Sequence, residues 1–360
     1  MTDHLTVQIE LGQRSYPVHI GPGLLSQAEP WQVLSAGKTL VVSNEVVAPL
    51  YLDALLASLG DRDCVTHIIA DGEPHKTLAT WSGIIDQLVG MQARRDCNLV
   101  ALGGGVVGDI CGFAAAAYMR GVRFFQVPTT LLAQVDSSVG GKTGVNHPKG
   151  KNLVGAFHQP GMVLIDTQTL ESLPLREFRA GMAEVVKYGA IMDLEFLAWL
   201  EKSVEAINGR QSDALSHLIQ RSVQNKARVV AADETEAGIR AILNFGHSFG
   251  HALEAITAYS EFLHGEAVAI GMVVAARLSE IRGLCPAGTA ARLDRLLQVL
   301  GLPTALPGHV SNAAMLEALQ LDKKAVAGGL RLILLQDAGN AVIDAASSRD
   351  QIESALDSCR

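Results

Sequence analysis

The 360-residue sequence is poor in cysteine, in aromatic residues and in positive charge. Its five cysteines form no CxxC pair and are odd in number, which argues against a thiolate zinc site and against a disulfide framework. The net charge of -8 argues against a broad nucleic-acid surface, because such a surface needs clustered cations to neutralise phosphates. We therefore expect a reducing, cytoplasmic location, no nucleic-acid partner and local binding of any anion.

Long hydrophobic runs are also absent. The longest charge-free apolar run extends from Ala267 to Ala276, whereas about 20 apolar residues are needed to span a bilayer. The amino terminus alternates like a pair of strands and lacks the basic-then-apolar layout of a signal peptide. We expect neither a membrane role nor export by that route.

What the sequence does contain is typical of a compact, enzyme-like protein with two domains. Apolar residues make up 48% of the chain and charged residues 18%. Up to about Ile165, short β-branched runs alternate with turns and helical stretches, which predicts a parallel sheet with helices on both faces. From Pro174 onward, long segments have helical periodicity. The predicted fold is α/β: a Rossmann-like parallel-sheet domain at residues 1–173, followed by a mainly α-helical domain at residues 174–360.

A glycine-rich turn follows one of the predicted strands, in NLVALGGGVVGDICGFAAAAYMRG. Gly103, Gly105 and Gly108 satisfy G-x-G-x-x-G between a strand and a helix, where the backbone can approach a pyrophosphate at the helix N-terminus. No acidic residue ends the next strand, VRFFQVP, where a Rossmann protein would hold the ribose. The DGE segment that begins at Asp71 is a candidate for the adenosine contact. The alternatives are a tight turn without a ligand and a solvated acidic turn.

A second polar stretch is PTTLLAQVDSSVGGKTGVNHPKGKN. It contains Asp136, Lys142, Lys149, Lys151 and Asn152 among threonines, serines and glycines. Hydroxyls, backbone amides and lysines suit phosphorylated or polyhydroxylated ligands. We predict a long functional loop here, with a merely solvated loop as the alternative.

Two histidines in NFGHSFGHALE are candidate metal ligands, although such a pair alone is more often polar packing. His247 and His251 are four residues apart and share a helix face. His264 starts a buried-looking helix, and Glu184 lies among apolar residues three positions before Lys187. A buried carboxylate needs a partner, which a metal ion or Lys187 would provide. Two histidines and one glutamate with an open position form a catalytic zinc arrangement. The spacing leaves open which histidine of the pair is the ligand, and polar packing is the alternative.

Taken in order, these motifs resemble the 3-dehydroquinate synthase family, from DGEPHKT at Asp71 to the DKK segment at Asp322. The resemblance implies an NAD-dependent enzyme with one divalent metal, zinc or cobalt, that acts as a homodimer. It implies conversion of a small phosphorylated sugar acid, 3-deoxy-D-arabino-heptulosonate 7-phosphate, to 3-dehydroquinate and phosphate. The implied route is transient oxidation by NAD, phosphate elimination, reduction and intramolecular aldol closure, in the shikimate pathway of aromatic amino acid biosynthesis.

The resemblance also implies roles for individual residues. The implied metal ligands are Glu184, His247 and His264, and His251 then handles a proton on the phosphate side of the substrate. The implied NAD contacts are Asp71, Gly72, Glu73, Lys76, Gly105, Val106, Val107, Gly108, Asp109, Thr129, Thr130, Lys142 and Lys151. The implied substrate contacts are Asp136, Lys142, Asn152, Lys187 and Asn244 on the phosphate and hydroxyl side, and Lys226 and Arg240 at the carboxylate. Arg120 resembles a residue that reaches the neighbouring subunit's site, and Lys324, beside Lys323, is a further candidate.

Three rival functions share part of this pattern. Another sugar-phosphate cyclase would keep the metal and NAD sites but would not need the carboxylate clamp at Lys226 and Arg240. A metal-dependent polyol dehydrogenase would release NADH, and the lysine-rich GKT…KGKN segment speaks against it, since a neutral polyol offers no phosphate. A non-catalytic dinucleotide-binding regulator would have no use for three metal ligands and an anion pocket.

Overall fold

The structure is a computed structural model that describes residues 4–236, 238–325 and 330–360, with only the backbone at 321–325. The chain divides into two compact units. The first contains Met1–Leu173 and Leu215–Ala231, and the second contains Pro174–Ala214 and Ala232–Arg360. The sequence placed residues 174–360 in the second domain. In the structure, Leu215–Ala231 groups with the first unit instead.

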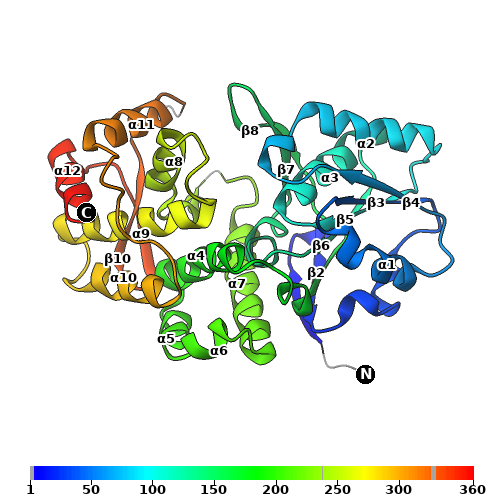
Figure 1. The fold of residues 1–360 in the computed structure, drawn as a ribbon, viewed down its shortest axis with the longest axis horizontal. Helices are drawn as coiled ribbons and strands as arrows, with labels where there is room; N and C mark the ends of the chain where they lie inside the picture. The colour runs from blue at the N-terminus through cyan, green and yellow to red at the C-terminus, as the bar shows by residue number, and fades with distance from the viewer. Residues whose placement is uncertain (1–3, 237, 326–329) are drawn as a thin grey trace. The chain divides into compact units, whose positions relative to one another are not determined.

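The first unit is built on a seven-stranded sheet in the order β1-β2-β9-β6-β5-β3-β4 (Figure 1). Its strands are β1 (Leu5–Ile9), β2 (Tyr16–Gly21), β3 (Thr39–Asn44), β4 (Cys64–Ile69), β5 (Asn98–Gly103), β6 (Arg123–Pro128) and β9 (Met162–Asp166). β1 pairs with β2 in antiparallel orientation, and the other neighbouring strands of this sheet pair in parallel. The mostly parallel, Rossmann-like sheet predicted from the sequence is confirmed.

Helices cover both faces of this sheet. Its longer helices are α1 (Ala48–Leu59), α2 (Leu78–Gly90) and α3 (Gly105–Ala117), and its short ones are η1 (Gly12–Arg14), η2 (Leu24–Ser26), η3 (Glu29–Val33), η4 (Glu73–His75), η5 (Tyr118–Arg120) and η7 (Thr167–Leu170). α2 and α3 pack on one face with Leu40 and Leu99, while α1, η2 and η3 pack on the other with Val41 and Val100. β3 and β5 are buried along their whole length because successive side chains enter opposite cores.

The polar stretch after β6 is more regular than the long loop that was predicted. It contains a short π-helix, η6 (Ala133–Ser137), and an antiparallel hairpin of β7 (Lys142–His147) and β8 (Gly150–Phe157). The two strands approach so closely that a Cβ at Gly155 would lie 2.1 Å from the Thr143 carbonyl oxygen. Glycine at this point therefore permits the pairing, and the lysines of this stretch belong to a hairpin.

The second unit is mainly helical, as predicted (Figure 1). Its helices are α4 (Leu175–Met192), α5 (Leu194–Lys202), α6 (Val204–Asn208), η8 (Ile239–Asn244), α8 (His247–Ile256), α9 (His264–Ile281), α10 (Thr289–Val299), α11 (Asn312–Ala325) and α12 (Arg349–Asp357). α7 (Ser212–Ala232) contains the segment that groups with the first unit. A hairpin of β10 (Leu332–Asp337) and β11 (Asn340–Asp344) was not predicted.

α9 is the central helix of the second unit. It packs against α4, α8, α10, α12 and β10, so its apolar run from Ala267 to Ala276 is buried on all sides. Among the described residues, no helix combines the length and the apolar character that crossing a membrane requires.

Candidate active site

Glycines bring three helices of the second unit into backbone contact. A Cβ at Gly265 would lie 1.9 Å from the Ala180 carbonyl oxygen, so α9 touches α4 one turn before Glu184. A Cβ at Gly271 would lie 2.1 Å from the Gly246 carbonyl oxygen, so α9 also touches the start of α8. Both contacts exclude any larger side chain, and they place His264 and His247 beside Glu184.

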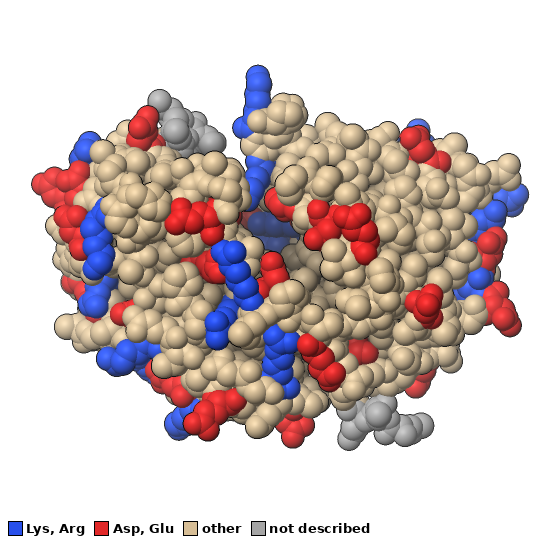
Figure 2. Space-filling view, viewed as in Figure 1, with Lys and Arg blue, Asp and Glu red and all other residues tan. Residues whose placement is uncertain are grey.

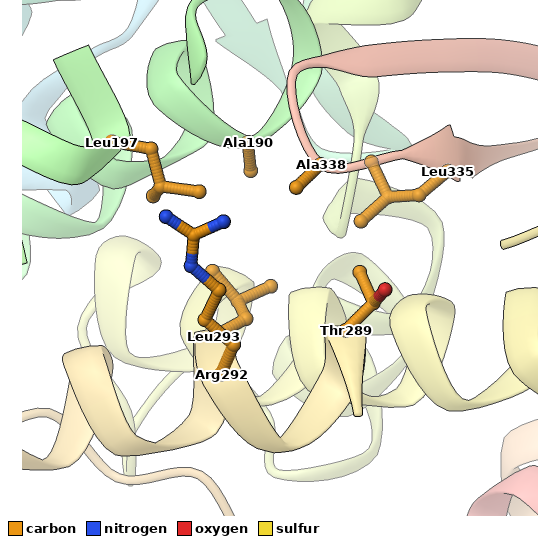
Figure 3. A pocket seen from close by; sticks show the side chains of 7 residues that line it. All are labelled: Ala190, Leu197, Thr289, Arg292, Leu293, Leu335 and Ala338. Carbon is orange, nitrogen blue, oxygen red and sulfur yellow. The ribbon is translucent and has the colours of Figure 1, made fainter. Parts of the chain in front are cut away.

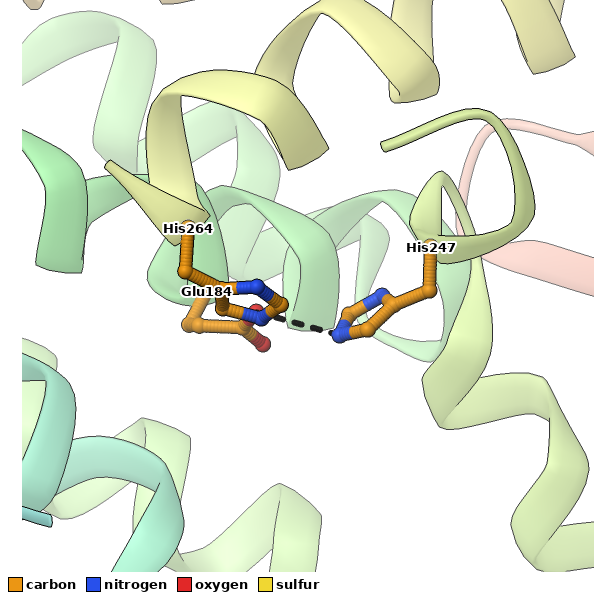
Figure 4. A group of neighbouring side chains, drawn as sticks. All are labelled: Glu184, His247 and His264. Atoms are coloured by element: carbon orange, nitrogen blue, oxygen red, sulfur yellow. Dashed lines mark ion pairs between the residues drawn. The ribbon is translucent and has the colours of Figure 1, made fainter. Parts of the chain in front are cut away.

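Glu184, His247 and His264 offer ligand atoms that all lie within 4.8 Å of one another (Figure 4). Nε2 of His247 lies 3.5 Å from Oε1 of Glu184, and Nε2 of His264 lies 3.9 Å from the same oxygen. Figure 4 shows the two imidazole rings converging on the carboxylate from different helices. Two imidazole nitrogens and one carboxylate oxygen match a three-ligand zinc site with an open position.

The surroundings of Glu184 fit a cation. Its side chain is 1% exposed, so the carboxylate is removed from water. Lys187, which is 2% exposed, forms an ion pair with Oε2 of Glu184 and offsets its buried charge. Burial lowers the pKa of His247 well below its ordinary value, and the positive charge of Lys187 lowers it further. His247 is therefore neutral at pH 7, as a metal ligand must be.

His251 lies next to this group. Its ring centroid is 5.4 Å from that of His247 and 5.7 Å from that of His264, and its side chain is exposed. His251, Glu254 and His264 form a second group whose ligand atoms lie within 4.8 Å of one another. The structure thus brings both histidines of the pair to the same place. Glu254 stands in the same motif, three residues after His251, but the sequence assigned it no role.

Two further predicted residues lie on η8 of the second unit. Arg240 is 2% exposed, and Nη1 of its guanidinium donates to the Glu234 carbonyl oxygen. Nδ2 of Asn244 donates to Oε1 of Glu236 at 3.1 Å. Glu236 has a backbone φ of +63° and was missed by the sequence analysis, which had no signal for it.

The glycine turn of the first unit sits where β5 leads into α3. α3 begins at Gly105, and a Cβ there would lie 2.9 Å from the Ser137 hydroxyl oxygen. A Cβ at Gly108 would lie 2.8 Å from a Gln126 side-chain oxygen, and Val107 is buried in the core while Val106 packs against it. The turn therefore presents bare backbone at a helix N-terminus, which suits a pyrophosphate.

The carboxyl ends of β3 and β5 lie beside this turn. β3 is flanked by β4 on one side and β5 on the other, so the strand order reverses there, which is the usual ligand position in such sheets. Nδ2 of Asn44, at the end of β3, donates to Asp71 at 2.5 Å, and Gly72 follows with a φ of +97°. The backbone N–H of Thr129 donates to the Gly103 carbonyl, and the Thr130 hydroxyl oxygen accepts from the backbone N–H of Ala133.

A hydrogen-bonded network links the predicted NAD and substrate residues of the first unit. Nζ of Lys76, which is 4% exposed, lies 2.5 Å from Asp109 and 2.7 Å from Oδ1 of Asn152. Burial raises the pKa of the Asp109 carboxyl, and Lys76 opposes that rise. Asn146, which the sequence analysis missed, donates to Glu73 and accepts from the backbone N–H of Asn152, both at 2.8 Å. Asn152 adopts a left-handed φ of +54°.

The remaining predicted residues lie on η6, α7, the β7–β8 hairpin, η5 and α11. Nζ of Lys226 donates to the carboxylate and the carbonyl of Asp136, at 2.8 and 2.7 Å. Lys142 and Lys151 are exposed on the β7–β8 hairpin, and Arg120 is exposed with a left-handed φ of +67°. The side chains of Lys323 and Lys324 lie outside the described residues.

Charge on the visible face is mixed in sign (Figure 2). Acidic and basic side chains both occur on this face of each unit. A small cavity in the second unit is lined by Ala190, Leu197, Thr289, Arg292, Leu293, Leu335 and Ala338 (Figure 3). Arg292 there pairs with Glu201, and the lining includes none of the predicted site residues.

The family models and the sequence relatives that match this chain name one family. A family model described as 3-dehydroquinate synthase N-terminal matches residues 66–180, and one described as 3-dehydroquinate synthase C-terminal matches residues 181–325. The 3-dehydroquinate synthase of Nitrosococcus oceani is 52% identical over 98% of this chain and 99% of its own length.

Two solved structures share the fold at lower identity. The 2-epi-5-epi-valiolone synthase of Streptomyces hygroscopicus subsp. jinggangensis 5008, with NAD+ and Zn2+ bound, is 31% identical with a TM-score of 0.89, over 99% of this chain and 98% of that one. A 2-deoxy-scyllo-inosose synthase complexed with carbaglucose-6-phosphate, NAD+ and Co2+ is 27% identical with a TM-score of 0.88, over 99% of this chain and 100% of that one.

Proposed function

Because the chain belongs to the 3-dehydroquinate synthase family, we propose that it converts 3-deoxy-D-arabino-heptulosonate 7-phosphate to 3-dehydroquinate and phosphate. The reaction is that of a carbon-oxygen lyase acting on a phosphate ester. The observation that carries the proposal is the gathering of Glu184, His247 and His264 within 4.8 Å in a chain that also has a glycine turn at the carboxyl end of a parallel strand.

We assign one divalent metal, zinc or cobalt, to Glu184, His247 and His264. The support is the donor set, the burial of the Glu184 carboxylate, and the Zn2+ and Co2+ of the two solved relatives. When bound, the metal supplies a Lewis acid for the substrate oxygens, and NAD supplies a reversible acceptor of hydride. The metal would also replace Lys187 as the partner of Glu184, which would free the Lys187 ammonium for the substrate phosphate.

We assign NAD to the first unit. The pyrophosphate would lie on the α3 N-terminus, formed by Gly105, Val106, Val107, Gly108 and Asp109, since bare backbone N–H groups favour its charge. The remaining proposed contacts are Asp71, Gly72, Glu73, Lys76, Thr129, Thr130, Lys142 and Lys151. Lys76 would mainly hold Asp109 and Asn152 in place, because its ammonium is buried between these two side chains.

We assign the substrate contacts by charge. Lys142 and Lys187 would neutralise the phosphate, with Asn152 and Asn244 as neutral donors. His251 would hold or move a proton on the phosphate side, because it is the exposed histidine beside the ligand group. Lys226 and Arg240 would bind the substrate carboxylate, and Asp136, already bonded to Lys226, would orient hydroxyls.

We further propose a homodimer in which Arg120 reaches the neighbouring subunit's site. Arg120 is exposed and follows Met119 in a left-handed backbone conformation, with Gly121 next at a φ of +116°. Two consecutive non-glycine residues in this region are strained, and such strain is frequent at functional sites. Cytoplasmic location stays a prediction from the sequence.

The main competing function is that of another sugar-phosphate cyclase, since both solved relatives are named for other cyclic products. A phosphate-release assay separates the two. Purified protein with NAD and zinc or cobalt is given either the heptulosonate phosphate or a heptulose phosphate that lacks the carboxylate. We expect release only from the acid, and none without NAD or metal. Equal release from the carboxylate-free sugar would assign the chain to the other cyclases.

A further inference from the structure

His264 contacts a buried carboxylate that belongs to neither the predicted ligands nor the predicted substrate contacts. Nδ1 of His264 lies 3.3 Å from Oε2 of Glu254. Glu254 is 4% exposed and lies on α8, seven residues after His247 and three after His251, so all three share a helix face. A carboxylate buried to this degree needs donors to offset its lost hydration.

His264 belongs to two overlapping groups of metal-ligating residues, but it faces them with different ring nitrogens. Its Nε2 is the atom near Glu184, at 3.9 Å from Oε1, whereas its Nδ1 is the atom near Glu254. A neutral imidazole carries one proton, so one nitrogen donates and the other has a lone pair for a metal. A proton on Nδ1, donated to Glu254, leaves the lone pair of Nε2 directed at Glu184 and His247.

We infer that Glu254 is a positioning residue that selects between the two groups. By accepting a hydrogen bond from Nδ1 of His264, it fixes the tautomer and the ring orientation in which Nε2 binds the metal with Glu184 and His247. The same bond removes Nδ1 of His264 from the alternative group with His251. His251 is thereby left without a metal and available for the substrate. This inference rests on the proposed metal site. It adds a residue, Glu254, that does not bind the metal but holds the ligand His264 through its other ring nitrogen.

The test is a measurement of metal affinity, made without substrate. Apo-protein is prepared by chelation, and the zinc affinity of wild type, Glu254→Gln, Glu254→Ala and Glu184→Gln is measured by competition with a chromophoric chelator. Ser279→Ala is the matched control, because it also removes a buried hydrogen bond on a helix of this unit, from the Leu335 N–H, but lies fifteen residues along α9 from His264. Circular dichroism of each apo-protein checks the fold.

We expect Glu254→Ala to weaken zinc binding by about 10- to 100-fold, the usual effect of losing such a partner. Glu254→Gln should lose less, because its amide oxygen still accepts from Nδ1 and its shape keeps the helix packed. Ser279→Ala should bind as wild type. The visible spectrum of the Co(II) form should change in Glu254→Ala, since the His264 ring is no longer held.

Three results would overturn the inference. Wild-type zinc affinity in both Glu254 variants, or a loss of affinity no larger than that of Ser279→Ala, would show that Glu254 does not position His264. The proposed metal site would still hold in that case if Glu184→Gln binds zinc more weakly than the wild type. Wild-type affinity in Glu184→Gln together with abolished binding in Glu254→Ala would instead place the metal at His251, Glu254 and His264. That outcome would reject the proposed metal site as well.

Discussion

At the residue scale, His247 and His251 differ in their surroundings although they share a helix face. His247 is largely buried and its Nε2 is 3.5 Å from Glu184, whereas His251 is exposed. We therefore predict that His247→Ala loses the metal and that His251→Ala keeps it. His251→Ala should still lower kcat, by about 100- to 10,000-fold if it moves a proton. Elemental analysis and kcat of the two variants check this, and loss of metal from His251→Ala alone would reverse the assignment.

Arg240 carries a second prediction at this scale. Its planar guanidinium suits a carboxylate, whereas a lysine keeps the charge and loses the two-pronged geometry. Hydrogen bonds to charged groups contribute about 1.5–3 kcal/mol, so Arg240→Lys should raise KM for the acid substrate by about 10- to 100-fold. The affinity for NAD, measured by fluorescence titration, is the control and should not change. An unaltered KM would remove Arg240 from the carboxylate clamp.

Residue types at fixed spacing predicted the candidate ligands, but they did not predict which histidine of the pair binds the metal. The four-residue spacing of His247 and His251 puts both rings on one helix face, so only surroundings distinguish them. Glu254 and Asn146 escaped prediction for a related reason. Their roles come from partners distant in the sequence, the Nδ1 of His264 and the carboxylate of Glu73.

At the element scale, strands and helices with strong apolar patterns were predictable, as was the antiparallel strand pair β1–β2 at the amino terminus. The β7–β8 and β10–β11 hairpins were not. β3, β5 and β9 are continuous apolar runs because both sides are buried. The β7–β8 hairpin carries polar and glycine residues that resemble a loop, and β10–β11 is a short pair within a helical half. Such pairs are stabilised by neighbouring elements more than by their own sequences.

Close helix packing gives a prediction at this scale. Gly265 allows α9 to touch α4, and an added Cβ would lie 1.9 Å from the Ala180 carbonyl oxygen. Gly265→Ala must therefore push the helices apart, at a cost of about 1–3 kcal/mol in unfolding free energy, and separate His264 from Glu184. Gly308→Ala is the control, because nothing lies within 4 Å of its added Cβ.

Denaturant unfolding and zinc titration of the two glycine variants provide the measurement. We expect a lower free energy of unfolding and weaker zinc binding only in Gly265→Ala. If both variants bind zinc like the wild type, the helix contact does not set the spacing of the ligands.

At the scale of the whole molecule, the division into a parallel-sheet part and a helical part follows from the sequence, but the full membership of each unit does not. Leu215–Ala231 follows the start of the helical half in the chain, yet it belongs to the first unit. Its Lys226 bonds to Asp136, ninety residues earlier. Helical periodicity shows which face of α7 is apolar, but it does not show whether that face packs in the core of the first or of the second unit.

For the whole chain, we propose that NAD assists phosphate elimination and is regenerated within each turnover. The coexistence of the α3 glycine turn with the lysines and asparagines proposed for phosphate is the reason for it, since a plain dehydrogenase needs only the turn. Phosphate and NADH absorbance are to be followed together while NAD is present well below the concentration of the heptulosonate phosphate. We expect many phosphates to be released per NAD, with no sustained rise in NADH. Accumulation of NADH in step with the substrate consumed would contradict it and make the protein a dehydrogenase.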